Sequence, residues 1–114
     1  MHEYGITKRI IKISTDAAKD YPSAKITDIY VVVGELTGFI GESIQMYFDV
    51  IGKGTLAEGA KLHIKMVPAK MHCGSCMTDF NRTKGTFDCP NCGALGAPTD
   101  IGKEFYVENI EIDK

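Results

Sequence analysis

The sequence predicts an α+β fold: a small three-stranded mixed sheet with two helices on one face, interrupted by an inserted zinc-ribbon subdomain. Three observations support this prediction. Two segments have the apolar spacing of amphipathic helices, three have the apolar content and alternation of strands, and all four cysteines fall within one short stretch. Their order along the chain is helix, strand, helix, strand, cysteine-rich stretch and strand, so the ribbon interrupts a helix-and-sheet layer.

The first helix is expected to begin almost at the first residue and to end near Tyr21, because Pro22 follows. Its apolar residues recur at steps of three and four: Ile6, Ile10, Ile13, Ala17 and Tyr21. The first strand is expected over residues 26–33, where side chains of both parities are β-branched or aromatic. That composition favours a central strand that is buried on both faces.

A glycine-rich loop over residues 34–41 leads into the second helix, and the carboxylates that flank it, Glu35 and Glu42, are interpreted as solvated. The apolar stripe of that helix consists of Ile44, Tyr47, Phe48 and Ile51, and Gly52 and Gly54 end it. A strand with one wet face follows, built on Leu62, Ile64 and Met66 and stopped by Pro68.

The last strand is expected from about Lys103 to Ile112, with a bulge near Glu108–Asn109 because the parity of its apolar residues changes there. The expected domains are therefore a helix-and-sheet domain formed by residues 1–68 and 99–114, and a ribbon domain formed by residues 69–98. The ribbon has too few apolar residues to fold without a metal.

The cysteines form two Cys-x-x-Cys pairs separated by twelve residues: Cys73 with Cys76, and Cys89 with Cys92. A Cys-x-x-Cys turn directs both sulfurs at one ion, and two such turns face to face offer four thiolates, which suits tetrahedral Zn²⁺. Four sulfur ligands leave no open position, so such a zinc ion is expected to be structural.

Other interpretations of the cysteines are weaker. Two disulfides would require an oxidising compartment, whereas no signal peptide opens the chain, so the cytoplasm is the expected location. A thioredoxin-like motif uses a single Cys-x-x-Cys at the start of a helix. An iron–sulfur centre also takes four cysteines, and neither it nor a metal-free ribbon is excluded by spacing alone.

Composition narrows the class of function. The net charge is −2 and the ribbon carries few basic residues, which gives no electrostatic case for nucleic-acid binding. No apolar run approaches the roughly 20 residues of a membrane helix. We find no Ser–His–Asp set and no phosphate-binding loop, so the chain is expected not to be an enzyme.

A histidine in second position can chelate a metal without any fold. The terminal amine of Met1, the backbone nitrogen of His2 and its Nδ1 form fused rings around one ion, and the backbone nitrogen of Glu3 can complete a nitrogen plane. Ni²⁺ and Cu²⁺ prefer that geometry. Every chain that begins Met-His has these atoms, however. Of the other histidines, His63 is expected to be solvated, and His72 lies beside a site that four cysteines already saturate.

Several segments together resemble one family: Met-His-Glu-Tyr at residues 1–4, Gly-Glu-Leu-Thr at 34–37, Glu-Gly-Ala-Lys-Leu at 58–62, Pro68 and the two Cys-x-x-Cys pairs. This family is HypA/HybF, the nickel-insertion metallochaperones of [NiFe]-hydrogenase maturation. The resemblance covers essentially the whole chain. It implies that His2 is a nickel ligand, with Met1 supplying the amine and Glu3 its backbone nitrogen or carboxylate, and that Cys73, Cys76, Cys89 and Cys92 bind zinc.

The resemblance also implies partners. Family members hand nickel to the [NiFe]-hydrogenase large-subunit precursor together with the GTPase HypB, and some also serve urease. The chain is then a carrier of Ni²⁺, monomeric or homodimeric, with a structural Zn²⁺. Some relatives have a histidine just after a Cys-x-x-Cys pair, whereas here Thr78 and Gly93 stand near those places. The alternative function is a zinc-ribbon module that binds nucleic acid or protein, against which the pI of about 5.9 argues.

Overall fold

The computed structural model describes residues 2–21, 23–82 and 86–113. The chain divides into two compact units. The first comprises Met1–Val32, Phe39–Lys65 and Tyr106–Lys114, and the second comprises Val33–Gly38 and Met66–Phe105. No helix in the described part of the chain is long and apolar enough to cross a membrane.

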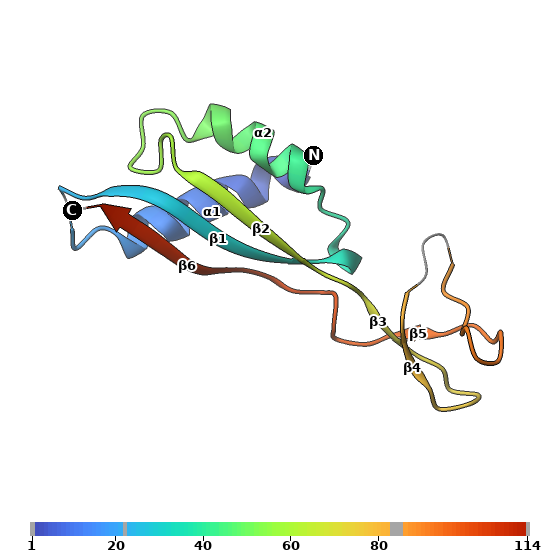
Figure 1. The fold of residues 1–114 in the computed structure, drawn as a ribbon. Helices are drawn as coiled ribbons and strands as arrows, with labels where there is room; N and C mark the ends of the chain where they lie inside the picture. Colours follow the sequence, from blue (N-terminus) through green and yellow to red (C-terminus); the bar gives the residue numbers. More distant parts are fainter. Residues whose placement is uncertain (1, 22, 83–85, 114) are drawn as a thin grey trace. The chain divides into compact units, whose positions relative to one another are not determined.

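The first unit is a helix-and-sheet layer. Its helices are α1 (His2–Ala17) and α2 (Gly41–Ile51), and its strands are β1 (Lys25–Gly34), β2 (Lys61–Val67) and β6 (Phe105–Asp113). The strand order is β2-β1-β6, so β1 is central, as its two-sided apolar composition predicted. In Figure 1, β1 and β2 run in the same direction and β6 runs against them, which makes the sheet mixed, and the two helices cover one face.

The buried face of α1 differs from the predicted stripe. Ile6 and Ile10 are buried, but Ile13 and Tyr21 are 42% and 44% exposed. The buried face is broader than predicted, and it also includes Thr7, Ile11, Ser14 and Ala18, which follows the helix. The prediction was wrong here because α1 contacts α2 in addition to lying over one face of the sheet (Figure 1). The contact with a second helix buries small polar residues, which the periodicity of apolar residues does not select.

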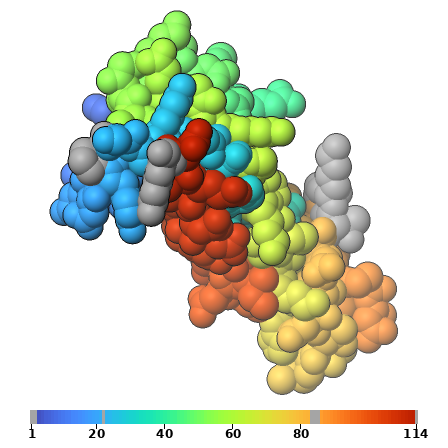
Figure 2. Space-filling model, turned by 60° about the vertical axis from the view of Figure 1, so that its left-hand side comes forward, coloured from blue at the N-terminus to red at the C-terminus, as the bar shows by residue number. Residues whose placement is uncertain are grey.

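The other elements of this unit follow their sequence patterns more closely. On α2, Ile44 and Phe48 are buried, as predicted, and on β2 Leu62 is buried while Met66 is 47% exposed. Along β6 the half-buried positions change parity at Glu108–Asn109, where two exposed residues stand in succession. Figure 2 shows this strand, in red, lying open along the surface of the molecule.

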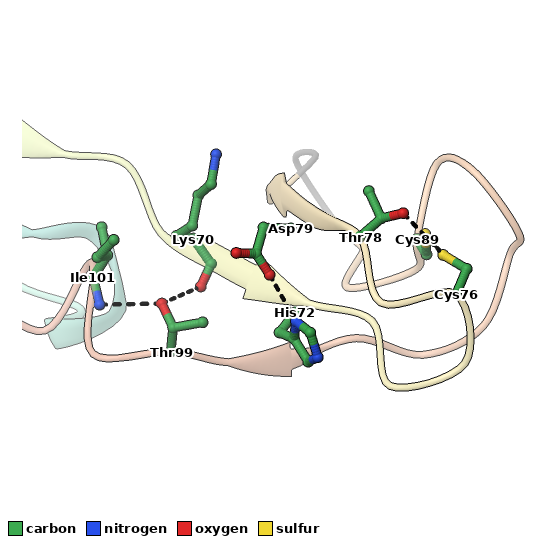
Figure 3. Close-up of polar contacts among 8 residues, drawn as sticks. All are labelled: Lys70, His72, Cys76, Thr78, Asp79, Cys89, Thr99 and Ile101. Carbon is green, nitrogen blue, oxygen red and sulfur yellow. Dashed lines mark hydrogen bonds and ion pairs between the residues drawn. The ribbon is translucent and has the colours of Figure 1, made fainter.

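The second unit contains the ribbon and the segments at its base, residues 33–38, 66–69, 82 and 99–105, which we call the ribbon root. Its strands are β3 (Lys70–His72), β4 (Asp79–Asn81) and β5 (Ala97–Pro98), in the order β4-β3-β5 with antiparallel pairing. Pro98 lies in an edge strand, where its missing N–H breaks no ladder. The Thr99 hydroxyl closes the base of the ribbon by donating to the Lys70 carbonyl and accepting from the Ile101 N–H (Figure 3).

The glycine-rich segment after β1 belongs to this second unit. It contains the 3₁₀ helix η1 (Glu35–Thr37), and its backbone pairs with the return segment: the N–H of Gly34 donates to the Glu104 carbonyl, and the N–H of Leu36 donates to the Gly102 carbonyl at 2.7 Å. A Cβ at position 34 would lie 2.1 Å from the oxygen of Gly102. Gly34 is therefore required by this close approach of two backbones.

Glu35 is not a solvated carboxylate, contrary to the sequence-based interpretation. Its Oε1 accepts a hydrogen bond from the N–H of Ala69 at 2.8 Å, and its Oε2 lies 3.1 Å from the guanidinium of Arg82. Arg82 in turn lies over the ring of Phe87, 4.6 Å from its centroid. One carboxylate thus fixes two segments of the ribbon root, which sequence spacing alone does not reveal.

Candidate metal centre

The two Cys-x-x-Cys turns have the same backbone hydrogen bonds. In the first, the N–H of Met77 donates to the Cys73 carbonyl at 2.8 Å. In the second, the N–H of Gly93 donates to the Cys89 carbonyl at 2.8 Å. Both residues that close the turns have positive φ, 60° for Met77 and 80° for Gly93. Glycine adopts that conformation at little cost, whereas the methionine adopts it because the turn requires it.

These turns bring all four sulfurs together. The Sγ atoms of Cys73, Cys76, Cys89 and Cys92 all lie within 4.8 Å of one another. The separations are 3.4 Å between Cys73 and Cys92, and 3.6 Å between Cys76 and Cys89. A disulfide would need about 2.05 Å, so the four thiols are free.

The donor set fits tetrahedral zinc. Four sulfurs at about 2.3 Å from one ion are separated from each other by about 3.8 Å, close to the spacing of these four atoms. The residues that would hold Zn²⁺ are therefore the four predicted cysteines, and with four thiolates no position remains for substrate or water. No other group of three or more ligating side chains is present among the described residues.

A small apolar cluster supports the sulfurs from beneath. Met71 and Phe80 are buried in cross-strand positions of β3 and β4, and they pack with the inner cysteines, Cys73 and Cys89. A Cβ at Gly96 would lie 2.5 Å from the far end of the Phe80 ring, so the backbone approaches that ring closely. The cluster has only two large apolar side chains, which agrees with the expectation that the ribbon needs a bound metal for its stability.

Hydrogen bonds favour the ionised form of one outer cysteine. The Thr78 hydroxyl lies 3.2 Å from Cys76 Sγ (Figure 3), and it lowers the pKa of Cys76 to about 6, with a smaller contribution from the side chain of Asn91. This donor-rich surrounding prepares a thiolate for a cation.

Cys92 has the opposite character in the metal-free protein. The backbone N–H of Ala94 lowers its pKa, but the neighbouring sulfurs of Cys73 and Cys76 outweigh that effect and raise the pKa of Cys92 to about 12. Four sulfurs this close cannot all ionise unless a cation balances them. Metal binding at this site must therefore release protons.

The histidine beside this site is engaged elsewhere. His72 Nδ1 lies 2.6 Å from Asp79 Oδ1, its cross-strand neighbour in the antiparallel pair of β3 and β4 (Figure 3). His63 on β2 is stacked on Tyr30 at 4.4 Å between ring centroids, and its Nε2 lies 3.4 Å from Asp28 Oδ2. The expectation that His63 is solvated was wrong, because this stack half-buries it.

The predicted amino-terminal ligands are described only in part. Met1 and the side chain of His2 lie outside the described part of the structure, and α1 begins at His2. The carboxylate of Glu3 accepts a hydrogen bond from the N–H of Ile40 at 3.2 Å. The backbone N–H groups of Glu3 and Ile40 lower the pKa of Glu3.

Sequence reasoning missed the residues that tune the sulfurs. Thr78 and Asn91 act on Cys76, and neither residue type is itself a usual zinc ligand. The available signal was position, since Thr78 stands two residues after one cysteine and Asn91 lies within the second Cys-x-x-Cys pair. Side chains this close to a thiolate in a tight turn are natural hydrogen-bond donors to it.

Fold and site together define a class: a small α+β protein with an inserted ribbon that carries a four-cysteine metal centre. A family model described as "Hydrogenase/urease nickel incorporation, metallochaperone, hypA" matches residues 1–112. The chain therefore belongs to the HypA family of nickel metallochaperones.

Relatives and solved structures agree with this assignment. The hydrogenase maturation factor HypA of Caldanaerobacter subterraneus subsp. tengcongensis is 42% identical over 114 residues, which cover 99% of this chain and 100% of that protein. HypA of Geobacter sulfurreducens is 37% identical over 114 residues, with the same coverage.

Two solution structures have the same fold. That of a HypA protein matches with a TM-score of 0.65 at 22% identity, covering 98% of this chain and 96% of its own. That of the Ni metallochaperone HypA from Helicobacter pylori matches with a TM-score of 0.63 at 21% identity, covering 96% of each chain. At such identities the likeness concerns the fold alone.

Proposed function

We propose that this protein carries Ni²⁺ at its amino terminus and delivers it to a [NiFe]-hydrogenase large-subunit precursor, with a structural Zn²⁺ held by Cys73, Cys76, Cys89 and Cys92. The nickel ligands are the amine of Met1, the backbone nitrogen and ring of His2, and the backbone nitrogen of Glu3. The observation that carries the proposal is membership of a nickel-incorporation family by a chain that has this amino-terminal sequence.

The other candidate metal ligands among the described residues are less suited to a transported nickel ion, which supports the amino-terminal location. The four cysteines form a closed site, and a carrier must be able to take up and release its ion. His63 and His72 each face one carboxylate and stand in no larger group of ligands within the described residues. A nitrogen plane at the chain end is the remaining arrangement that Ni²⁺ prefers.

The carboxylate of Glu3 is a positioning group in this proposal. It receives the N–H of Ile40, just before α2, so it ties the start of α1 to the start of α2. Glu3 then contributes its backbone nitrogen to nickel, while its side chain holds the first turn of α1 in place.

Delivery requires partners. We propose that this protein binds a HypB-type GTPase and the hydrogenase precursor during delivery, in the cytoplasm. Urease maturation is a second route within the same family. The protein acts by binding and release, not as an enzyme. Titration of equimolar nickel-loaded protein into a metal-free hydrogenase precursor, with and without the GTPase, should move Ni²⁺ to the precursor while zinc stays behind.

The nickel site is tested with untagged protein, because a residue placed before Met1 turns the ligating amine into an amide. His2→Ala should abolish nickel binding in titration calorimetry, while zinc content and the circular dichroism spectrum stay unchanged. His72→Ala is the matched control and should bind nickel as the wild type does. Undiminished nickel affinity of His2→Ala would refute the assignment.

A further inference from the structure

Strand β2 has a free edge. The strand order is β2-β1-β6, so β1 pairs with one edge of β2 while the other edge is the border of the sheet (Figure 1). Among the described residues, no backbone hydrogen bond from outside the sheet reaches residues 61–65. Alternate residues of an edge strand direct their N–H and C=O groups outward, where an added strand can pair with them.

The two faces of β2 differ in composition. Leu62 is buried, and the Cδ1 of Ile64 lies 3.6 Å from the place that a Cβ at Gly41, the first residue of α2, would take. Leu62 and Ile64 belong to the helix side. Successive side chains of a strand point to opposite faces, so Lys61, His63 and Lys65 lie on the face without helices, which we call the open face.

The middle of the open face is occupied by contacts within the chain. The ring of His63 stacks on Tyr30 with 4.4 Å between centroids and 8° between planes, and its Nε2 lies 3.4 Å from Asp28 Oδ2. The hydroxyl of Tyr30 donates to the carboxylate of Glu111 on β6. These side chains from three strands hold one another in place, so His63 is engaged with groups of its own chain.

The lysines on either side of His63 determine which strand can be added. Lys61 and Lys65 are exposed, and neither has an ion pair with a residue that the structure describes. If two copies paired antiparallel about His63, Lys61 of each copy would lie opposite Lys65 of the other, and like charges in that position are destabilising. Lysines on an edge strand therefore disfavour a second copy, whereas they attract a strand that carries carboxylates.

We propose that the free edge of β2 binds an extended segment of a partner protein in which acidic residues alternate with apolar ones. The acidic side chains lie on the open face beside Lys61 and Lys65. The apolar side chains lie on the helix side beside Ile64, which is half-buried. Backbone pairing supplies affinity and the lysines supply selectivity. This binding function is additional to the carriage of nickel and does not depend on it.

The probe is a synthetic peptide of about nine residues, capped at both ends, in which glutamate alternates with valine. In an NMR titration of isotope-labelled, untagged protein, it should shift the amide signals of residues 61–65 and slow their hydrogen exchange. Binding should weaken as salt rises from about 0.05 M to about 0.5 M. The same peptide with lysine in place of glutamate should bind about tenfold more weakly or less.

Charge reversal on β2 is the decisive variant. Lys61→Glu/Lys65→Glu should bind the glutamate peptide about tenfold more weakly than the wild type does and should bind the lysine peptide instead. Lys19→Glu/Lys53→Glu changes the net charge equally at exposed lysines outside the sheet, and it should bind both peptides as the wild type does. Thermal melting checks that each variant is folded.

Backbone pairing has its own test. Residues of a strand whose side chains share a face direct their N–H groups to the same edge. A glutamate peptide that is N-methylated at all its glutamates and one that is N-methylated at all its valines should therefore differ, because only one of them loses the donors that face β2. Equal binding by the two would overturn strand addition.

Three other results would overturn the proposal. The first is a wild type that leaves the amides of residues 61–65 unchanged at about 1 mM glutamate peptide and the lowest salt. The second is a Lys61→Glu/Lys65→Glu variant that keeps the peptide preference of the Lys19→Glu/Lys53→Glu control. The third is protection of the β2 amides that grows with protein concentration in the absence of peptide, which would make a second copy the occupant of this edge.

Discussion

Glu35 should stabilise the root of the ribbon by about 2 kcal/mol, a contribution that Glu35→Ala removes. Two interactions are lost. The N–H of Ala69, a fully buried residue, loses the carboxylate that accepts it at 2.8 Å, and an unsatisfied buried donor costs about 1–3 kcal/mol. The ion pair with Arg82 contributes less, about 0–1 kcal/mol, because the two side chains are 36% and 25% exposed.

The effect should be measured locally, since the chain has two compact units that need not unfold together. Native-state hydrogen exchange reports the opening of the Ala69 amide directly. A loss of about 2 kcal/mol should speed its exchange roughly thirtyfold in zinc-loaded protein. If the whole chain melts in one transition, the same loss lowers the melting temperature by about 8 °C.

Two matched variants separate the contributions. Glu35→Gln keeps an oxygen for Ala69 but loses the charge opposite Arg82, so it should cost less than about 1 kcal/mol. Glu108→Ala removes an exposed carboxylate of β6 and should leave exchange at Ala69 unchanged. Equal exchange at Ala69 in Glu35→Ala and the wild type would refute the reasoning, as would a Glu35→Gln variant as damaged as Glu35→Ala.

Two further outcomes follow from the metal centre. Cys73→Ser should lose the bound zinc and unfold the ribbon, because structural zinc contributes on the order of 10 kcal/mol to such modules. Mass spectrometry should show the loss of metal, and hydrogen exchange should show the loss of protection in β3. Retained zinc would contradict this prediction. Gly96→Ala should destabilise the ribbon by about 1–3 kcal/mol, because the added Cβ would lie 2.5 Å from the Phe80 ring. Gly74→Ala is the control and should leave the stability unchanged, because a Cβ there would meet nothing within 4 Å. The rate of zinc release to a chelator measures both effects.

The metal centre was predictable because the residues that form each half of it are close together in the sequence. A Cys-x-x-Cys pair closes its own turn, and the residues with positive φ that complete both turns lie within the same short segments. Strand β1 was predictable for a related reason, since a strand with apolar residues of both parities is typical of the centre of a sheet.

Contacts between distant segments were not predictable. Glu35 binds Ala69 and Arg82, which are 34 and 47 residues away, and nothing in the sequence around Glu35 distinguishes it from a solvated carboxylate. The prediction of the buried face of α1 was wrong for the same reason, because the burial of Thr7 and Ser14 depends on the position of a second helix. Periodicity reports one contact surface, and α1 has two.

The start of α1 also bears on why an amino-terminal motif suits nickel. Binding to backbone nitrogens removes their protons, which would break the hydrogen bonds of a strand or a helix interior. The first four N–H groups of a helix have no intrahelical acceptor, and the backbone nitrogens of His2 and Glu3 are in that position because α1 begins at His2.

The charge of the terminal amine is a second reason why the proposed site favours nickel binding. An unliganded terminal amine is an ammonium group of charge +1, and the positive end of a helix dipole disfavours a nearby cation. In the proposed nickel complex, two amide anions would balance the divalent ion and the amine and imidazole would carry no charge, so the complex would be neutral. In this proposal, loading removes the positive charge of the amine, whereas acid restores the ammonium and the amide protons together. The proposed site should consequently release nickel steeply as the pH falls, which nickel titrations at a series of pH values measure.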